Sequence, residues 1–374
     1  MLKVMTVVGT RPEVIKLSRI IPSFDKFFDH RLVHTNQNYD YELNKIFFDE
    51  LEIRQPDIFL DTASSSASGT ISNVISQVDE QIKEFDPDAF FILGDTNSCL
   101  SAISAKRNKI PIFHFEAGNR CFDFRVPEEI NRKIVDHVSD INITYSQIAK
   151  DYLLNEGLPP DQIICAGSPM KEILNYYEKN INSSKIMKKI DLEFSSFFLI
   201  SMHREETVDD KEKLNEIFKT LTELKEIYKK RIIISCHPRT KNRLEEFKIE
   251  TDKDLEFFNP FSFLDYIQLQ KNAFIVISDS GTITEESSIL NFPAINLREE
   301  HERPEGFEEG AVMFTGISSK NIKNSIAILS EQKRGDQRDI KIVRDYDGVN
   351  ISKKVVRIIL SYTDFVNRRI WKRY

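Results

Sequence analysis

The apolar positions of the chain fall into short runs separated by longer amphipathic stretches. The first run is Met1 to Val8, and a polar turn and a helical pattern follow it before the next run, Arg31 to Thr35. Short apolar runs without strict alternation are typical of strands that are buried on both faces, as in parallel sheets. The repeated order of strand and helix therefore predicts an α/β protein with a doubly wound parallel sheet.

The same alternation continues to about residue 166. A polar loop is expected over residues 36–40, and a Ser- and Ala-rich loop over residues 62–69. The other predicted helices of this half are Tyr41–Leu51, Thr70–Phe85, Ser98–Arg107 and Gln147–Glu156, and the other predicted strands are Ala89–Leu93, Ile110–Phe115, Ile141–Tyr145 and Ile163–Ala166.

A second alternating series begins near residue 197. The interval from Ser168 to Glu193 has no strand pattern and many Lys and Asn residues, so a domain boundary is expected there. The predicted strands are Phe197–Met202, Arg231–Cys236, Leu255–Phe258, Phe274–Ser278 and Ala294–Leu297, and the predicted helices are Lys211–Lys229, one near Lys241, Phe263–Lys271, one entered from residues 279–286, and Asn350–Val366. We therefore predict two Rossmann-like domains with a cleft between them: residues 1–170 together with a C-terminal helix of about 355–374, and residues 171–354.

Length and charge narrow the class of protein. A chain of 374 residues exceeds what one hydrophobic core usually organises, which supports two domains. The net charge of −7 and a pI near 5.7 argue against a nucleic-acid partner, because such partners usually require a basic face. No apolar run approaches the length of a membrane span, so no membrane insertion is expected.

Cysteine spacing gives no sign of a metal centre or a disulfide framework. The four cysteines are widely separated and form no C-x-x-C motif. Such usage is typical of a reducing compartment, and the N-terminal apolar run is only a few residues long. We therefore expect a cytoplasmic protein without a bound metal.

Acidic residues follow two strands in the middle of the first half. Asp95 and Glu116 come at successive strand ends, and Glu128 follows shortly afterwards. Ligands bind at this edge of an open α/β sheet, so the three carboxylates are expected to converge there. Any one of them is equally well explained as a helix N-cap or an exposed loop acid. The arginines close to them in sequence are Arg120, Arg125 and Arg132. The joint occurrence of the three carboxylates and the three arginines favours a catalytic cluster.

The turn after the first strand carries positive charge into a helix. Thr10 and Glu13 stand three apart as a capping box, and Pro12 is tolerated in the first turn of a helix. The positive charges of Arg11 and Lys16 are unfavourable at the start of a helix, where the helix dipole is itself positive, unless an anion lies there. A phosphate site is therefore plausible. Two solvated basic residues explain the motif equally well.

The second half has polar strand ends of its own. Ser280 and Gly281 lie at a strand-to-helix turn whose N–H groups can hold a diphosphate, and Glu286 can accept hydrogen bonds from ribose hydroxyls. A lone histidine after a strand is more often a capping or packing residue than a catalyst. However, His203, Ser280 and Arg303 are each placed to face the predicted cleft, which favours anion binding.

A set of short motifs runs through the chain in a fixed order. They are G-T-R-P-E at 9–13 with Lys16, G-D-T at 94–96, H-F-E-A-G-N-R at 114–120, P-E-E-I-N-R at 127–132, M-H-R-E at 202–205, D-S-G at 279–281 and E-R-P-E at 302–305. Together they resemble the non-hydrolysing UDP-N-acetylglucosamine 2-epimerases over nearly the whole chain. The amino-acid sequence of residues 96–100 and 116–137 resembles that of one branch of this family. Enzymes of that branch convert UDP-2-acetamido-2,6-dideoxy-L-talose to UDP-N-acetyl-L-fucosamine for capsule or O-antigen.

This resemblance implies a glycosyltransferase-B-like fold, a homodimer, a UDP-N-acetyl sugar as substrate, and neither a metal nor a nicotinamide cofactor. It also implies anti elimination of UDP to a 2-acetamidoglycal, followed by re-addition. The catalytic positions that it implies are Asp95, Glu116, Glu128 and His203. The positions implied to hold UDP are Arg11, His203, Ser280, Gly281, Glu286 and Arg303, with Lys16 and Arg132 supporting charge.

The chemistry of C2 agrees with a carboxylate cluster. A pyranose C2 proton has no carbonyl beside it, so its abstraction must be coupled to loss of the C1 diphosphate, which cations and N–H dipoles stabilise. Bases on both faces of C2 are then needed. Phe122 and Phe124, close to Glu128 in sequence, favour a deoxy sugar's methyl group, although both rings can equally pack the loop.

Two segments depart from the family pattern. Thr282 replaces a Gly of the usual D-S-G-G, and residues 36–39 differ from the loop associated with allosteric binding of UDP-N-acetylglucosamine, so allosteric control is not expected. The alternatives are a UDP-N-acetylglucosamine/UDP-N-acetylmannosamine 2-epimerase, a sugar-nucleotide glycosyltransferase that requires an acceptor, and a non-catalytic UDP-sugar sensor that has no use for the carboxylates.

Overall fold

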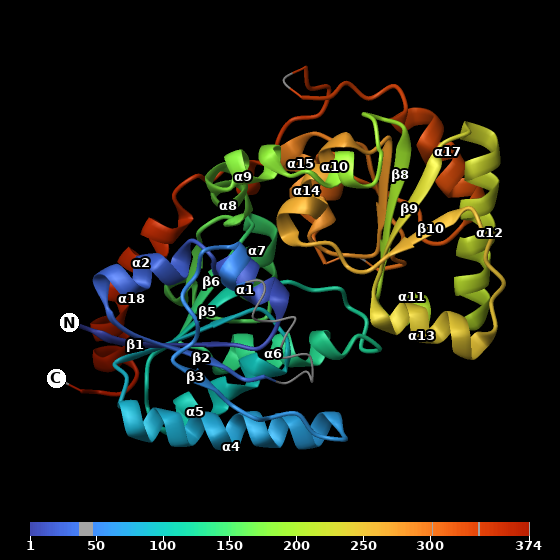
Figure 1. Cartoon of the computed structure of the whole chain (residues 1–374). Coiled ribbons are helices and arrows are strands. Elements are labelled where there is room, and N and C mark those ends of the chain that lie inside the picture. Colours follow the sequence, from blue (N-terminus) through green and yellow to red (C-terminus); the bar gives the residue numbers. More distant parts are fainter. Residues whose placement is uncertain (37–47, 301, 336, 374) are drawn as a thin grey trace. The chain divides into compact units, whose positions relative to one another are not determined.

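The computed structural model describes residues 1–36, 48–300, 302–335 and 337–373, and the chain forms two compact units (Figure 1). Unit 1 contains Met1–Asn175 and Asp345–Tyr374, and unit 2 contains Tyr176–Arg344. Each unit is built on one parallel sheet, so the predicted pair of parallel α/β domains is confirmed.

The sheet of unit 1 has seven strands in its described part, all of them parallel, in the order β3-β2-β1-β4-β5-β6-β7. The strands are β1 (Lys3–Val8), β2 (Asp29–His34), β3 (Ile58–Phe59), β4 (Ala89–Leu93), β5 (Ile112–Ala117), β6 (Ile141–Thr144) and β7 (Ile163–Cys165). The strand order reverses between β1 and β4. In doubly wound sheets, loops at such a reversal diverge and leave room for a ligand.

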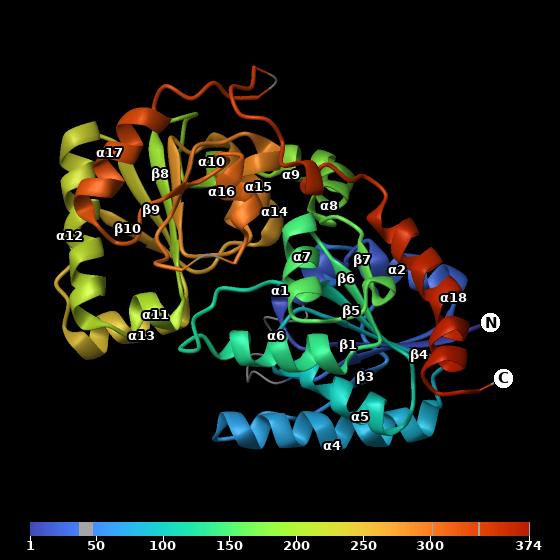
Figure 2. The same ribbon diagram turned by 180° about the vertical axis from the view of Figure 1, so that it is seen from behind.

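Helices cover both faces of this sheet. They are α1 (Arg11–Leu17), α2 (Ile20–Phe27), α4 (Ala67–Phe85), the 3-10 helix η1 (Asn97–Ser101), α5 (Ala102–Arg107), α6 (Pro127–Val138), α7 (Gln147–Asn155), α8 (Met170–Tyr176) and α18 (Ile351–Arg369). Figure 1 and Figure 2 show α4, α5 and α6 on one face, and α18 beside α2 on the other. Apolar side chains such as Val7, Ile92 and Val135 fill the core between the sheet and α4–α6.

Unit 2 repeats this plan with six parallel strands in its described part, in the order β10-β9-β8-β11-β12-β13. They are β8 (Phe197–Met202), β9 (Arg231–Cys236), β10 (Leu255–Phe258), β11 (Ile275–Ser278), β12 (Ala294–Asn296) and β13 (Met313–Phe314). The helices are α9 (Glu178–Ser183), α10 (Ile186–Lys189), α11 (Glu205–Val208), α12 (Lys211–Tyr228), α13 (Pro238–Phe247), α14 (Phe263–Asn272), α15 (Ile283–Leu290), α16 (Pro304–Glu308) and α17 (Ser319–Leu329). The strand order reverses between β8 and β11, so each unit has one reversal point.

Several element boundaries differ from the sequence-based expectation. The helix α4 begins at Ala67, because Ser66 caps it by accepting from the N–H of Gly69, and part of the expected loop over residues 62–69 is therefore helical. Glu116 lies inside β5 rather than after it. The expected helix Tyr41–Leu51 and the expected loop over residues 36–40 lie mostly outside the described residues.

In the described part of the chain, no helix combines the length and the apolar character that a membrane crossing requires.

Candidate active site

Glu13 joins the two loops at the reversal point of unit 1. Its Oε2 accepts from the N–H of Gly9 at 2.7 Å and of Thr10 at 2.6 Å, and its Oε1 accepts from the hydroxyls of Ser98 at 2.5 Å and Thr96 at 3.1 Å. Burial raises the pKa of Glu13, while the hydrogen bonds from Ser98, Gly9 and Thr10 oppose that rise. The predicted capping box is present, and one carboxylate fixes the loops after β1 and β4.

Glu116 lies at the end of β5 in an unusual backbone conformation. Its φ of +67° is left-handed, and the register of β5 on β6 shifts between Phe115 and Ala117. The side chain is only 8% exposed, and its Oε2 lies 2.5 Å from Nζ of Lys16, which is buried on α1. Asn119 Nδ2 also donates to Glu116, at 3.4 Å. The backbone thus turns this carboxylate toward a buried cation.

Asp95 has a cationic partner from α6. Its Oδ2 accepts from Nη2 of Arg132 at 2.6 Å and from Nε at 3.0 Å, and Asn131 donates to its backbone carbonyl at 2.9 Å. Arg132 is itself buried and also contacts Glu129 at 3.1 Å. Glu128 lies one turn before Arg132 on the same helix and is half-buried. The loop after β4 and the helix α6 therefore meet at this edge of the sheet.

The loops at the reversal point of unit 2 are joined by Asp279. This buried carboxylate accepts from the backbone N–H of His203 and of Arg204, each at 2.9 Å, and its Oδ1 lies 3.5 Å from Nδ1 of His203. Desolvation lowers the pKa of His203, the charge of Asp279 opposes this shift and that of Arg204 adds to it. A histidine in this position can exchange a proton with a substrate.

The turn after β11 brings small residues close to a buried arginine. Ser280 Oγ lies 3.1 Å from Oγ1 of Thr282, the residue before α15. A Cβ placed on Gly281 would lie 3.5 Å from Oε2 of Glu302 and 3.7 Å from Nε of Arg303. A side chain at position 281 would therefore touch the Arg303 guanidinium group, so this group lies close to the turn.

Arginines and carboxylates form a buried cluster around this turn. Nη1 of Arg303 lies 3.2 Å from Oε2 of Glu285, which is fully buried on α15. Arg298 follows β12 and contacts Glu302 at 3.1 Å and Glu206 at 3.2 Å. Guanidinium groups beside a helix start are suited to binding a phosphate or diphosphate.

Glu286 lies deeper in the same helix. It is buried, and its Oε2 accepts from Nε2 of Gln270 on α14 at 2.6 Å. The nearby Tyr266 is half-buried, and desolvation together with the charge of Glu286 raises the pKa of its hydroxyl. The predicted acceptor for a ribose is thus oriented by a neighbouring amide.

A protein-family model described as UDP-N-acetylglucosamine 2-epimerase matches residues 23–360. The chain belongs to this family. A solved UDP-N-acetylglucosamine 2-epimerase from Rickettsia bellii is 50% identical, with a TM-score of 0.93 and complete coverage of both chains. A solved structure of the Methanocaldococcus jannaschii enzyme, in complex with UDP-GlcNAc and UDP, is 34% identical, with a TM-score of 0.89 over 96% of this chain and 100% of that one. Aligned over 343 residues, a UDP-N-acetylglucosamine 2-epimerase of that organism is 37% identical, covering 89% of this chain and 93% of that protein.

These similarities bear out the broader sequence-based predictions. The protein is a UDP-sugar 2-epimerase of the non-hydrolysing type, built from two parallel-sheet α/β units like the glycosyltransferase-B enzymes. They leave the identity of its sugar to be proposed.

The structure separates the three arginines that the sequence placed near the carboxylates. Arg132 contacts Asp95, whereas Arg120 is buried against Asp136 and Glu156. Arg125 is exposed and pairs with Asp123 of its own loop. Arg132 therefore pairs with a candidate catalytic carboxylate.

Sequence reasoning missed several residues that shape the two reversal points. They are His114, Asp136, Arg298 and Glu285. Motif membership offered a weak signal for His114, which lies two residues before Glu116. Nothing in the local pattern distinguishes Arg298 or Asp136 from a solvated surface charge. Within the described residues, no three His, Cys, Asp or Glu side chains gather closely enough to hold a metal ion.

Proposed function

We propose that the enzyme epimerises C2 of a UDP-2-acetamido-2-deoxy sugar by eliminating and re-adding UDP. The observation that carries this proposal is the pairing of two carboxylates with buried cations at one sheet edge, Glu116 with Lys16 and Asp95 with Arg132. Carboxylates that are held and partly desolvated in this way are suited to moving a proton at carbon.

In the elimination step, a carboxylate removes the C2 proton as the C1–O bond breaks, and UDP leaves with the electron pair of that bond. The product is a 2-acetamidoglycal. Re-addition of UDP at C1 is coupled to return of a proton to the other face of C2. Asp95, Glu116, Glu128 and His203 are proposed to provide the acid and base groups, and the cations Lys16 and Arg132 keep the carboxylates in place.

The leaving diphosphate is assigned to Arg11, His203 and the turn of Ser280 and Gly281, together with Arg303. Support comes from the buried guanidinium group that lies against this turn. Hydrogen bonds to the developing negative charge lower the barrier to elimination. Glu286, held by Gln270, is assigned to the ribose hydroxyls.

Exchange at C2 tests this function directly. When the enzyme is incubated with candidate UDP-N-acetyl sugars in heavy water and followed by NMR, we expect C2 to exchange its proton for deuterium as the epimer forms. A glycosyltransferase would consume the sugar nucleotide only when an acceptor is present. A UDP-sugar sensor would bind without exchange, and either result would refute the proposal.

We propose UDP-2-acetamido-2,6-dideoxy-L-talose as the substrate, with UDP-N-acetylglucosamine as the alternative that the relatives' names favour. Phe122 and Phe124 are 64% and 66% exposed, so most of the surface of these residues is not used in packing the loop. Phe122 has a left-handed φ of +58°, and its N–H donates to Glu129, which fixes the loop. Exposed apolar rings on a fixed loop suit a C6 methyl group.

Substrate preference should follow from these rings. We expect kcat/KM for the 6-deoxy sugar nucleotide to exceed that for UDP-N-acetylglucosamine by roughly tenfold or more, because a methyl-sized difference in an apolar site is worth about 1 to 3 kcal/mol. Steady-state kinetics of the wild type and of Phe124→Ser with both substrates measure this ratio of kcat/KM values. Equal efficiency of the wild type on both would overturn the substrate assignment and leave the epimerase assignment intact.

Two further features of the protein are proposed from the family resemblance. A homodimer is expected from the family resemblance, and sedimentation of the purified protein tests it. The product would serve capsule or O-antigen synthesis.

A further inference from the structure

We propose that His114, Asp136 and Arg120 form a buried positioning module that fixes the backbone on both sides of Glu116 and ties it to the loop of Asp95. The inference rests on the proposed function, because it assigns these three residues the task of holding the carboxylates that act on C2. None of the three is proposed to touch the substrate.

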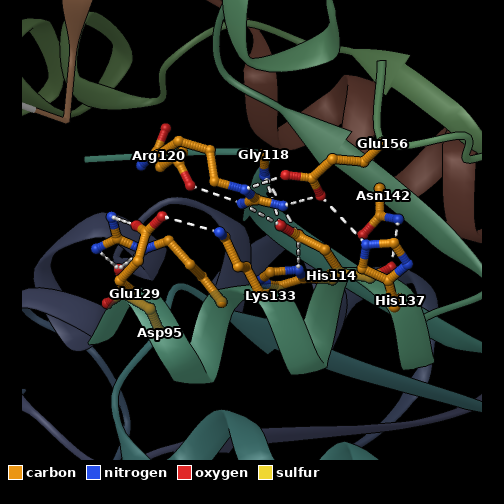
Figure 3. A network of polar contacts seen from close by, with 12 residues as sticks. Asp95, His114, Gly118, Arg120, Glu129, Lys133, His137, Asn142 and Glu156 are labelled. Carbon is orange, nitrogen blue, oxygen red and sulfur yellow. Dashed lines mark hydrogen bonds and ion pairs between the residues drawn. The ribbon is translucent and has the colours of Figure 1, made fainter. Parts of the chain in front are cut away.

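Asp136, on α6, binds the chain before and after Glu116. Its Oδ1 lies 2.9 Å from Nδ1 of His114, two residues before Glu116, and its two oxygens accept from the N–H of Gly118, two residues after, at 3.2 and 3.3 Å. Figure 3 shows His114 and Arg120 close to Gly118. Its Oδ2 also accepts from Nη1 of Arg120 at 2.6 Å. One carboxylate thus holds three points of the segment 114–120.

The segment that Asp136 holds contains two left-handed residues. Glu116 has φ of +67° and Gly118 has φ of +83°. A non-glycine residue occupies this region only when its surroundings impose it. A Cβ on Gly118 would lie 2.4 Å from the carbonyl oxygen of Ala149, so the backbone also packs closely against α7. The direction of the Glu116 side chain therefore depends on contacts made by its neighbours.

His114 connects the positioning module to the loop of Asp95. Its Nε2 lies 2.8 Å from the carbonyl oxygen of Gly94, the residue before Asp95. A carbonyl oxygen only accepts, so Nε2 is the donor of this contact. The ring thereby connects β5 to the end of β4, where Gly94 has φ of +71°.

Asp136 is fully buried but has a cationic partner in Arg120, which is also buried. Burial alone would raise the pKa of Asp136, but the contacts of His114 and Arg120 hold it below its usual value. Arg120 donates to Glu156 at 2.7 and 2.6 Å and to the carbonyl of Asn119 at 2.7 Å. Arg120 therefore pairs with both Asp136 and Glu156, and a buried carboxylate such as Asp136 requires a paired cation of this kind.

The opposite end of β5 offers a matched comparison. Asp140 is also buried, accepts from the N–H of Ile112 at 2.9 Å and pairs with Lys106 at 2.5 Å. Asp136 and Asp140 thus hold the same strand through a backbone N–H and a cation. Only Asp136 lies beside the candidate catalytic carboxylates. Substitution of either Asp136 or Asp140 should therefore lower stability, whereas only substitution of Asp136 should lower turnover.

The test compares Asp136→Asn with Asp140→Asn. For Asp136→Asn we expect kcat to fall by roughly thirtyfold or more, because a displacement of about 1 Å of a catalytic group can cost a factor of about a hundred. KM and the Kd for UDP should stay within about threefold of the wild-type values. For Asp140→Asn, kcat should stay within about threefold. Thermal unfolding of both variants shows whether they are destabilised to a similar extent.

Equal kcat values for the two variants at matched stability would overturn the positioning role. If Asp136→Asn does not fold, His114→Gln decides the question, since it removes the ring that joins Gly94 to Asp136: a loss of kcat of roughly tenfold or more supports the module, and unchanged kcat refutes it. Failure of the proposed function is distinguishable, because the wild-type enzyme would then show no exchange at C2 with any UDP-N-acetyl sugar.

Discussion

Replacing Glu116 by Gln is expected to lower kcat for C2 epimerisation by roughly a hundredfold or more, as is typical for loss of an acid–base group. The amide keeps the shape of the carboxylate but cannot take up a proton. Lys16 would lose its partner at 2.5 Å and become a buried cation beside a neutral group, which also changes the local charge. Steady-state turnover followed by NMR of the C2 proton measures the loss.

The same reasoning applies to Asp95→Asn and Glu128→Gln. Each should reduce kcat by roughly a hundredfold or more while the affinity for UDP changes much less, since the nucleotide is assigned to other residues. Near wild-type turnover in all three carboxylate variants would refute the assignment of the cluster as the acid and base groups.

A carboxylate at the other edge of the same sheet provides the control. Asp88 precedes β4 and accepts from the N–H of Lys3 at 2.8 Å, and it is exposed. Asp88→Asn should leave turnover within about twofold of the wild type, because substitutions at exposed positions away from the site usually have small effects. Loss of turnover in Asp88→Asn would show that activity is lost on substitution of any carboxylate of this sheet, and not only of those at the carboxyl ends of its strands.

Much of the fold follows from the hydrophobic pattern. Strands such as Ala89–Leu93 and Arg231–Cys236 have the predicted bounds, because a run of buried residues between polar turns has few alternative structures. The two-residue strands β3 and β13 were not predicted, since two residues cannot show a period. The start of α4 was misplaced because Ser and Ala suit both a loop and a first helical turn.

The sequence also predicted which residues lie at strand ends, but not their partners. Lys16 and Glu116 are 100 positions apart, and their contact depends on the order of strands β1, β4 and β5 in the sheet. Arg120 and Arg132 look equivalent in sequence, yet Arg120 is used by the positioning module and Arg132 contacts Asp95. Pairings of this kind are set by topology and not by local composition.

The two units use the same structural device at their reversal points. In unit 1 Glu13 accepts from the loops after β1 and β4, and in unit 2 Asp279, at the end of β11, accepts from the loop after β8. Each buried carboxylate satisfies backbone N–H groups that would otherwise be left without partners. A fixed backbone at these points is what a site needs if it must hold charge in a defined geometry.

Loss of the Arg303 guanidinium group is expected to weaken UDP binding by roughly 1.5 to 3 kcal/mol, the range for a hydrogen bond to a charged group, or roughly 10- to 150-fold in Kd. Arg303 is only 3% exposed and lies close to the turn of Gly281. Calorimetry of Arg303→Gln with UDP alone measures the effect. Arg11→Ala, at the start of α1, should weaken binding by a similar amount.

The pairing of Arg303 with Glu285 at 3.2 Å has to be separated from its contact with the nucleotide. Arg303→Gln leaves a buried carboxylate without this cation, which should destabilise unit 2. In the double variant Arg303→Gln/Glu285→Gln the charge is balanced again, so the thermal midpoint should recover while UDP binding stays weak. Arg334→Gln is the matched control, because Arg334 donates to the carbonyl oxygens of Ala273 and Phe274 at the amino end of β11. Unchanged affinity in both the Arg11 and Arg303 variants would mean that the diphosphate binds elsewhere.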